Sequence, residues 1–485
     1  MASRKKRLSL KQCLINFQLS GAYPLFFAAV CAISGMGDKR IYLPAISILA
    51  ISILFSIFCV KDNKVFLAPI LMSYYSLGTD RVNGYIDSNG NVTASFDQNG
   101  FIGICFLAAI IIIPLIFRFI LDGSFVLAIR KKSLFLFGIL ALDAAILLGG
   151  LFSKHWNLKS IFYGIVLIAG LNVFFLMLSS IVKKCDKDIF PYTCRILILT
   201  CLVISAQVIV AALRAHAQND LVIFSTSMDR WLIQRSHFSF SWGLPTIVGA
   251  SAIIGIPAAF YLAKNERYPA LYYCCALLFW GVSFIVNTRS AMIVGAFFLL
   301  IGAVIASCSG KNKKTNLFLS VVLGAGFLAA AAIFCARAAL HGNLGNLLTD
   351  AYKLFRFDSV YDRIRIFKAG LGDFVSYPVF GVGWSKGALE TNVRTDNFYG
   401  NMYHCIIIQL GASTGVVGIT AFVYHFKDIA ILAIKQFRAD RLLLLAVPIM
   451  ILSLSLVDNF IFYLNFQIIY AAFLVLAERH CELSQ

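Results

Sequence analysis

The chain has 485 residues, of which 60% are apolar and only 13% are charged, and its mean hydropathy is +0.83. Soluble domains carry about 25% charged residues, so this composition excludes a chain built only of soluble domains. The formal net charge is +19, but many Lys and Arg residues stand in short loops between apolar runs and no nucleic-acid-binding motif is present. We therefore expect no nucleic-acid partner.

Apolar runs that suit membrane helices follow one another along the chain. A spanning helix needs about 20 such residues. The runs are 22–36, 41–60, 65–78, 100–121, 133–152, 158–182, 190–213, 243–263, 268–286, 289–307, 316–337, 402–425, 441–457 and 460–478. Because 65–78 is short and suits a tilted or re-entrant piece, the sequence predicts an all-α, polytopic transmembrane helical bundle of about 12–14 spans.

The charges of the loops indicate which side of the membrane each loop faces. If the N-terminus is cytoplasmic, every cytoplasmic loop is basic, from Lys61–Lys64 near the start to the tail at Arg479. Loop 79–99, with three Asp residues and one Arg, then falls outside. This pattern follows the positive-inside rule. It predicts a multi-pass protein of the cytoplasmic (inner or plasma) membrane, in contact with membrane lipids, with both termini in the cytoplasm.

Two long outer segments divide the chain. The expected parts are N-terminal transmembrane helices over 1–213, an extracytoplasmic loop over 214–242, transmembrane helices over 243–337, a large extracytoplasmic loop over 338–401 and C-terminal transmembrane helices over 402–485. Apolar residues at helical spacing predict an amphipathic helix near 351–375 in the larger loop. Such a helix lies on the membrane or roofs a cavity.

Three arginines on the outer side are candidates for binding an anion. Arg289 lies in a tight polar turn between two apolar runs, and Arg363 and Arg365 flank Ile364 in the expected amphipathic helix. The Arg side chain presents a fork of donors that matches phosphate oxygens. The alternatives are that Arg289 extends its charge to the membrane surface and that the other two form helix ion pairs.

Two further titratable residues stand out by position. His404 opens the run 402–425 at the outer surface, where it can act as a proton acceptor near neutral pH or be only an interfacial residue among aromatics. Asp143 lies inside the run 133–152, so we expect it to be protonated or paired, with Arg195 or Gln207 as its partner. No residue spacing is typical of a metal site, and we expect neither metal nor cofactor.

Several short motifs fall in a fixed order between residues 230 and 425. The motifs are 235–249, Thr288-Arg289-Ser290-Ala291, 363–370, 377–384, and His404 followed by 409–418. Together they resemble the signature region of the O-antigen ligase and polymerase superfamily of membrane glycosyltransferases. The chain departs from the family pattern at Phe367 (usually Trp), Cys405 (Asn), Ser413 (Glu) and 244–246 (His-Pro-Asn).

The resemblance implies an inverting, metal-independent glycosyltransferase. Its donor would be a glycan on a polyprenyl diphosphate and its acceptor a second glycan or a lipid-linked molecule. Arg235, Arg289 and Arg363 would bind the diphosphate, with Arg365 in reserve, and His404 would be the general base. The stretch that begins at Arg235 resembles the polymerase branch, which we favour over a ligase that transfers the glycan to a lipid, protein or wall acceptor.

A transporter or flippase for glycans or small molecules is the alternative from a different class. Transporters tend to have repeated halves, broken helices and charged groups at mid-membrane. The two halves of this chain are dissimilar, and the polar candidates gather on one side. The sequence therefore favours surface chemistry over transport.

Overall fold

The computed structural model describes residues 9–36, 39–76, 85–86, 92–93, 113–123, 133–220, 237–240, 242–340, 358–384, 402–434 and 438–484. Over these residues the chain is helical, apart from connecting loops and one antiparallel pair of two-residue strands, β1 (Tyr85–Ile86) and β2 (Val92–Thr93). The prediction of a helical fold is confirmed. Every apolar run predicted from the sequence overlaps at least one helix.

The N-terminal half contributes helices of very different length. Its named helices are α1 (Leu10–Leu19), α2 (Ala22–Met36), α3 (Lys39–Cys59), η1 (Asn63–Phe66), α4 (Leu67–Met72), η2 (Ser73–Ser76), α7 (Leu136–Leu147), α8 (Leu158–Val182) and α9 (Ile189–Ala217). The short run 65–78 is broken into η1, α4 and η2. The Asn157 side chain caps α8 by accepting a 3.0 Å hydrogen bond from the Ser160 N–H.

The C-terminal half carries most of the candidate site. Its named helices are α11 (Pro245–Ile253), α12 (Ile256–Asn265), α13 (Pro269–Ile285), α14 (Arg289–Cys308), α15 (Lys313–Leu340), α17 (Asp358–Ser376), α18 (Ile406–Ile434), α19 (Ala439–Ser455), η4 (Phe460–Phe462) and α20 (Leu464–Glu482). Proline stands in the first turn of α11, α12 and α13. There its missing N–H leaves no hydrogen bond unmade.

Four helices among the described residues are long and apolar enough to cross a membrane: α9, α11 together with α12, α14 and α18. The pair α1 and α2, bent by 82°, adds a fifth if it counts as one span. This is compatible with a helical membrane protein. The number is below the expected 12–14 because helices such as α7 and α13 are shorter than a full span, and because part of the run 100–121 lies outside the described residues.

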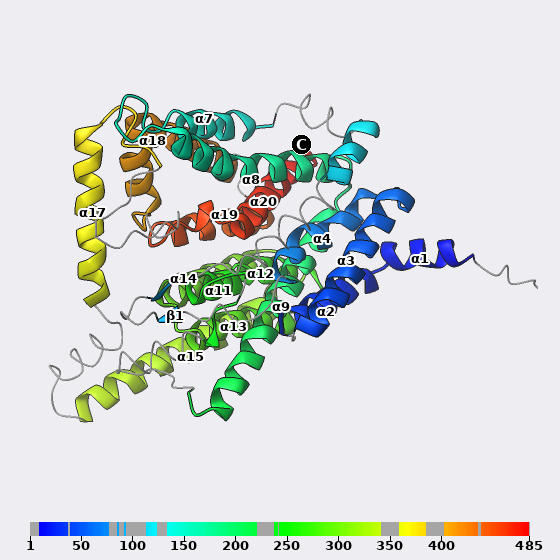
Figure 1. Ribbon diagram of the computed structural model, residues 1–485. Coiled ribbons are helices and arrows are strands. Elements are labelled where there is room, and N and C mark those ends of the chain that lie inside the picture. Colours follow the sequence, from blue (N-terminus) through cyan, green and yellow to red (C-terminus); the bar gives the residue numbers. More distant parts are fainter. Residues whose placement is uncertain are drawn as a thin grey trace, which may run out of the picture.

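The helices are arranged in two groups around a buried centre. In Figure 1, α7, α8 and α18 lie on one side, α11 to α15 lie on the other, and α19 and α20 run between them. The centre is tightly packed: a Cβ atom at Gly302 of α14 would lie 2.3 Å from the ring of Phe260 on α12. The helix α17 runs across the ends of the bundle at one edge (Figure 1). It overlaps the amphipathic helix predicted near 351–375 over residues 358–375, and residues 351–357 of that prediction lie outside the described residues.

Candidate functional site

His404 and Asp458 form a pair at the end of the bundle. The Nδ1 atom of His404, just before α18, lies 2.9 Å from Oδ1 of Asp458, in the turn after α19. His404 has a positive φ of 54°, in the left-handed region, which costs a non-glycine residue about 1–3 kcal/mol. The surrounding contacts must therefore hold the backbone of His404 in this conformation.

The electrostatics of Asp458 determine what its partner can do. Burial raises the pKa of the Asp458 carboxyl, but the hydrogen bond and charge of His404, the charge of Arg363 and the Asn459 N–H lower it more strongly. The net pKa lies below the ordinary value, so Asp458 is ionised at neutral pH. An ionised carboxylate only accepts hydrogen bonds, so Nδ1 of His404 donates. In the neutral form of the ring, the other nitrogen, Nε2, then carries the lone pair that can take a proton.

Arg363 approaches the same turn from α17. Its guanidinium Nη1 donates a hydrogen bond to the carbonyl oxygen of Val457, directly before Asp458. Arg363 is partly buried, whereas Arg365 is exposed on another face of α17. The structure therefore brings two of the predicted residues, Arg363 and His404, to one place, and it separates Arg365 from them.

Contacts with the start of α18 fix the position of α17. The Tyr403 hydroxyl donates a 2.5 Å hydrogen bond to Asp373 of α17. Burial, together with the neighbouring Asp373 carboxylate, raises the pKa of Tyr403, so its phenol stays protonated. The two segments approach closely at Gly370, where a Cβ atom would lie 2.4 Å from Ile408. The helix that carries Arg363 is thus anchored directly beside His404.

The structure describes one of the other two predicted arginines. Arg289 is the first residue of α14, as the sequence predicts for a tight turn, and Asn287 in that turn has a positive φ of 56°. The turn is held against α11 because the Thr288 hydroxyl donates a 2.9 Å hydrogen bond to the Pro245 carbonyl. Arg235 lies outside the described residues.

The segment 377–384 of the family-like pattern has a structural role. Its backbone runs beside residues 412–417, where Gly415 (φ 65°) breaks α18. The segment and the broken helix exchange hydrogen bonds, including Val382 N–H to Ala412 O at 2.7 Å and Val416 N–H to Pro378 O at 2.8 Å. A Cβ atom at Gly415 would lie 2.3 Å from the Val379 carbonyl. Gly415 therefore allows the two backbones to approach closely.

The N-terminal half forms the other wall of this segment. The Gly150 N–H donates to the Phe380 carbonyl at 2.7 Å, and the Trp384 N–H donates to the Ser160 hydroxyl at 3.0 Å. The indole of Trp384 also donates to the carbonyl of Ile146 on α7 at 3.0 Å. The segment 377–384 is thus held between the connection from α7 to α8 on one side and the break in α18 on the other.

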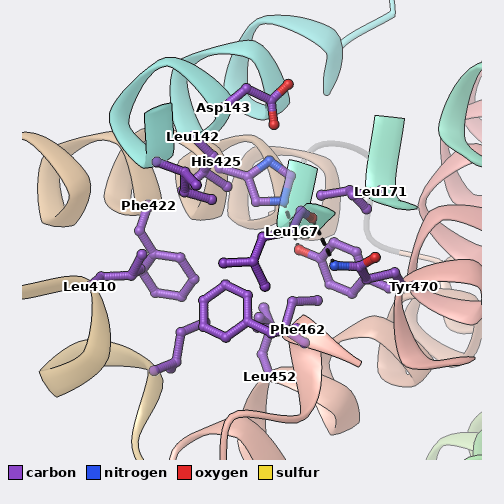
Figure 2. Close-up of a pocket in the computed structure, with 14 residues that line it drawn as sticks. Leu142, Asp143, Leu167, Leu171, Leu410, Phe422, His425, Leu452, Phe462 and Tyr470 are labelled. Carbon is purple, nitrogen blue, oxygen red and sulfur yellow. Dashed lines mark hydrogen bonds between the residues drawn. The ribbon is translucent and has the colours of Figure 1, made fainter. Parts of the chain in front are cut away.

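A small cavity of about 40 Å³ is lined by residues of α7, α8, α18, α19, η4 and α20. Its lining includes Ile406 and Ile461, which follow His404 and Asp458 closely in sequence. Nε2 of His425 lies 2.7 Å from the Tyr470 hydroxyl, and Figure 2 draws both side chains in the lining. The lining is mainly apolar, and the volume suits a few water molecules rather than a charged diphosphate.

The predicted partners of Asp143 were wrong. Asp143 accepts a 2.5 Å hydrogen bond from the Asn172 side chain on α8, and Figure 2 shows its carboxylate directed away from the other cavity side chains. Arg195 instead pairs with Glu266, and Gln207 accepts a hydrogen bond from the Trp242 indole. The bundle places α7 against α8 and α18 rather than against α9, so neither expected partner faces Asp143.

Sequence reasoning did not identify Asp458. The available signal was the polar pair Asp458-Asn459, which interrupts two apolar runs on the side predicted to hold His404. With Asp458 included, the site consists of an oriented base and a neighbouring guanidinium, which suits removal of a proton from a hydroxyl group beside a bound anion. Comparison of the chain with protein-family models found no match, and comparison with curated proteins found none either.

Proposed function

We propose that the protein is a membrane glycosyltransferase that polymerises polyprenyl-diphosphate-linked oligosaccharide repeat units at the outer face of the cytoplasmic membrane, for surface polysaccharide synthesis. The observation that carries the proposal is the His404–Asp458 pair with Arg363 bound to the same turn. A base oriented by a carboxylate, next to a fixed cation, matches the needs of a reaction that deprotonates a hydroxyl and releases a diphosphate.

In the proposed reaction, Nε2 of His404 takes the proton of the acceptor hydroxyl as its oxygen attacks the anomeric carbon of the donor. The bond between that carbon and the diphosphate breaks, and the diphosphate leaves with the electron pair. Arg363 stabilises the leaving group together with Arg235 and Arg289, and Arg365 is a further candidate for this role. Direct displacement inverts the anomeric centre, and His404 then returns its proton to water. The arginines supply the positive charge, so the proposal requires no metal.

The acceptor distinguishes the two closest versions of this function. A polymerase uses a second lipid-linked repeat unit, whereas a ligase transfers the glycan to a lipid, a protein or a wall polymer. The stretch that begins at Arg235 supports the polymerase. Both versions use the same base and the same leaving group, so the site geometry supports them equally.

The strongest argument for transport is the break in α18 at Gly415. Transporters use broken helices to bind ions and substrates. Here, however, the Ala412 carbonyl and the Val416 N–H near the break are paired with backbone groups of 377–384. They are therefore not directed toward a polar cavity. This pairing supports a structural role for the break, and transport remains the second candidate.

The function is tested with purified protein in liposomes that contain a lipid-diphosphate-linked oligosaccharide. We expect wild-type protein to produce longer lipid-linked chains and free polyprenyl diphosphate, and His404→Ala to produce neither while still inserting into the membrane. Full activity of His404→Ala would exclude His404 as the base. Product only after addition of a lipid or protein acceptor would identify a ligase. Flux of intact lipid-linked glycan without bond formation would identify a transporter.

A further inference from the structure

Gln409 connects the residues on either side of the candidate base and its carboxylate. The side-chain oxygen Oε1 of Gln409 accepts a 2.8 Å hydrogen bond from the backbone N–H of Tyr403, directly before His404. The same oxygen accepts a 3.1 Å hydrogen bond from the side-chain amide of Asn459, directly after Asp458. One buried atom therefore joins the two turns that carry the catalytic pair.

The orientation of the Gln409 amide is fixed by its partners. A backbone N–H can only donate, so the atom facing Tyr403 must be the oxygen. The nitrogen Nε2 then donates to the Ser413 hydroxyl at 2.8 Å, one turn further along α18. Gln409 is 3% exposed, and Tyr403 and Asn459 are both fully buried. Water cannot replace these hydrogen bonds without rearrangement of the packing.

The backbone conformation of His404 and its distance from Asp458 both need support from other residues. His404 has a left-handed backbone conformation, which its own sequence does not favour. Asp458 lies 54 residues away along the chain, so nothing local sets the distance between the two side chains. The Gln409 oxygen holds the backbone N–H before His404. Through Asn459, whose N–H donates to Asp458 Oδ1 at 2.9 Å, it also holds the carboxylate.

We propose that Gln409 is a positioning residue, which keeps His404 and Asp458 at hydrogen-bond distance without touching either substrate. The effect on catalysis rests on the proposed function, whereas the connection between the two turns does not. Loss of the Gln409 oxygen lets the two turns separate. A displacement of about 1 Å in a reacting group can lower a rate about 100-fold, so the rate of transfer is sensitive to this residue.

Three variants separate the two ends of the Gln409 side chain. Gln409→Leu removes both ends at similar volume. Gln409→Glu keeps an acceptor for Tyr403 and Asn459, and the Ser413 hydroxyl can reverse its role and donate to it. Ser413→Ala removes only the partner of Nε2. We expect Gln409→Leu to lower kcat about 10- to 100-fold with an unchanged KM for the lipid-linked donor. Gln409→Glu and Ser413→Ala should stay within about threefold of wild type.

A double-mutant cycle tests whether Gln409 acts through the pair. In an Asp458→Asn background the pair is already disturbed, so Gln409→Leu should cost less than about threefold in kcat. If the two substitutions lower kcat independently, so that their fold losses multiply in the double variant, the proposal is contradicted. A rise in KM with unchanged kcat would also contradict it, because that result places Gln409 in substrate binding.

Hydrogen–deuterium exchange of the full-length protein gives a readout that needs no activity. We expect faster exchange in Gln409→Leu for peptides that cover residues 402–406 and 456–462, and unchanged exchange there in Gln409→Glu. Peptides that cover 420–434 serve as the internal control. Unchanged exchange in 402–406 and 456–462 of Gln409→Leu would overturn the proposal even if transfer is observed. If wild-type protein transfers no glycan, the exchange result still decides the role of Gln409, while the proposed function fails separately.

If Gln409→Leu does not fold, Asn459→Ala takes its place, because it removes only one of the two donors. This variant should show faster exchange in residues 402–406, although the substituted position lies outside that peptide. It should also have a lower kcat. Normal exchange in 402–406 would show that Asn459 and Tyr403 are not coupled through Gln409, and it would overturn the proposal.

Discussion

Arg363 on α17 donates a hydrogen bond to the carbonyl of Val457, so the helix that crosses the end of the bundle is attached to the turn that presents Asp458. The same helix is attached to the start of α18 through Asp373 and Tyr403. The turn after α19 and the start of α18 are therefore both held by α17. The position of α17 and the distance between His404 and Asp458 should change together when one of these contacts is removed.

Replacement of Asp458 by Asn should nearly stop glycan transfer. The amide keeps the shape of the side chain but can donate to Nδ1 of His404, which stabilises the ring form whose Nε2 carries the proton and cannot act as a base. By analogy with other base–carboxylate pairs, we expect a loss of about 100- to 10,000-fold in kcat. The measurement is the release of polyprenyl diphosphate. Asp373→Asn, which alters a carboxylate bound to Tyr403, should lose much less; equal losses would contradict an orienting role for Asp458.

Asp458 also links folding stability to pH. The pKa of its carboxyl in the folded protein lies below the ordinary value of 3.8. The ionised carboxylate therefore stabilises the folded state fully above the unfolded pKa, and this contribution is lost as the pH falls through the folded pKa. We expect wild type to unfold at a higher temperature than Asp458→Asn at about pH 6, and the difference to shrink below about pH 4. A difference that persists unchanged in acid would rule out this linkage.

The two arginines of α17 should differ in their response to the same substitution. Lys keeps the charge of Arg but lacks its planar fork of donors. Arg363→Lys should lower kcat/KM for the lipid-linked donor about 10-fold, because Arg363 is fixed at the turn beside Asp458. Arg365→Lys, on the exposed side of the helix, should stay within about twofold. A larger loss for Arg365→Lys would place the diphosphate on the other face of α17.

Replacement of Gly415 by Ala should destabilise the protein. Gly415 has a positive φ of 65°, and a Cβ atom there would lie 2.3 Å from the Val379 carbonyl, so neither the backbone nor the neighbouring segment can accept it. We expect a loss of at least about 2 kcal/mol in the free energy of unfolding. The matched control is Gly372→Ala on α17, where a Cβ atom meets nothing within 4 Å and Ala favours the helix. Thermal unfolding in detergent compares the two, and similar losses would argue against a special backbone at Gly415.

The sequence predicted the helices well because apolar runs of membrane length have few other stable conformations. It did not predict where α18 breaks. The residues 409–418 are compatible with a continuous helix, and only the approach of 377–384 makes the break at Gly415 stable. The ends of the helix also differ from the prediction, because the expected run is 402–425 and α18 extends over Ile406–Ile434.

Only part of the arrangement around the candidate site could be predicted from the sequence. The position of His404 at the start of an apolar run and the Arg-rich amphipathic helix were visible in the sequence, and Arg363 lies where it can act beside His404. The carboxylate partner was not visible, because Asp458 is separated from His404 by the whole of α18 and α19. The partner of Asp143 depends on which helices pack together, and the apolar runs contain too little polar pattern to specify that packing.

The hydrogen bonds between the segment 377–384 and Gly150, Ile146 and Ser160 mean that the region of residues 377–418 does not form a unit independent of the N-terminal half. A fragment that starts after α9 would retain His404, Asp458 and Arg363 but would lack the surface on which Trp384 rests. A chimera that exchanges the C-terminal half between related chains would need a matching α7–α8 connection. The helices α7 and α8 and the connection between them therefore belong to the architecture of the candidate site, although the proposed reaction assigns no role to their residues.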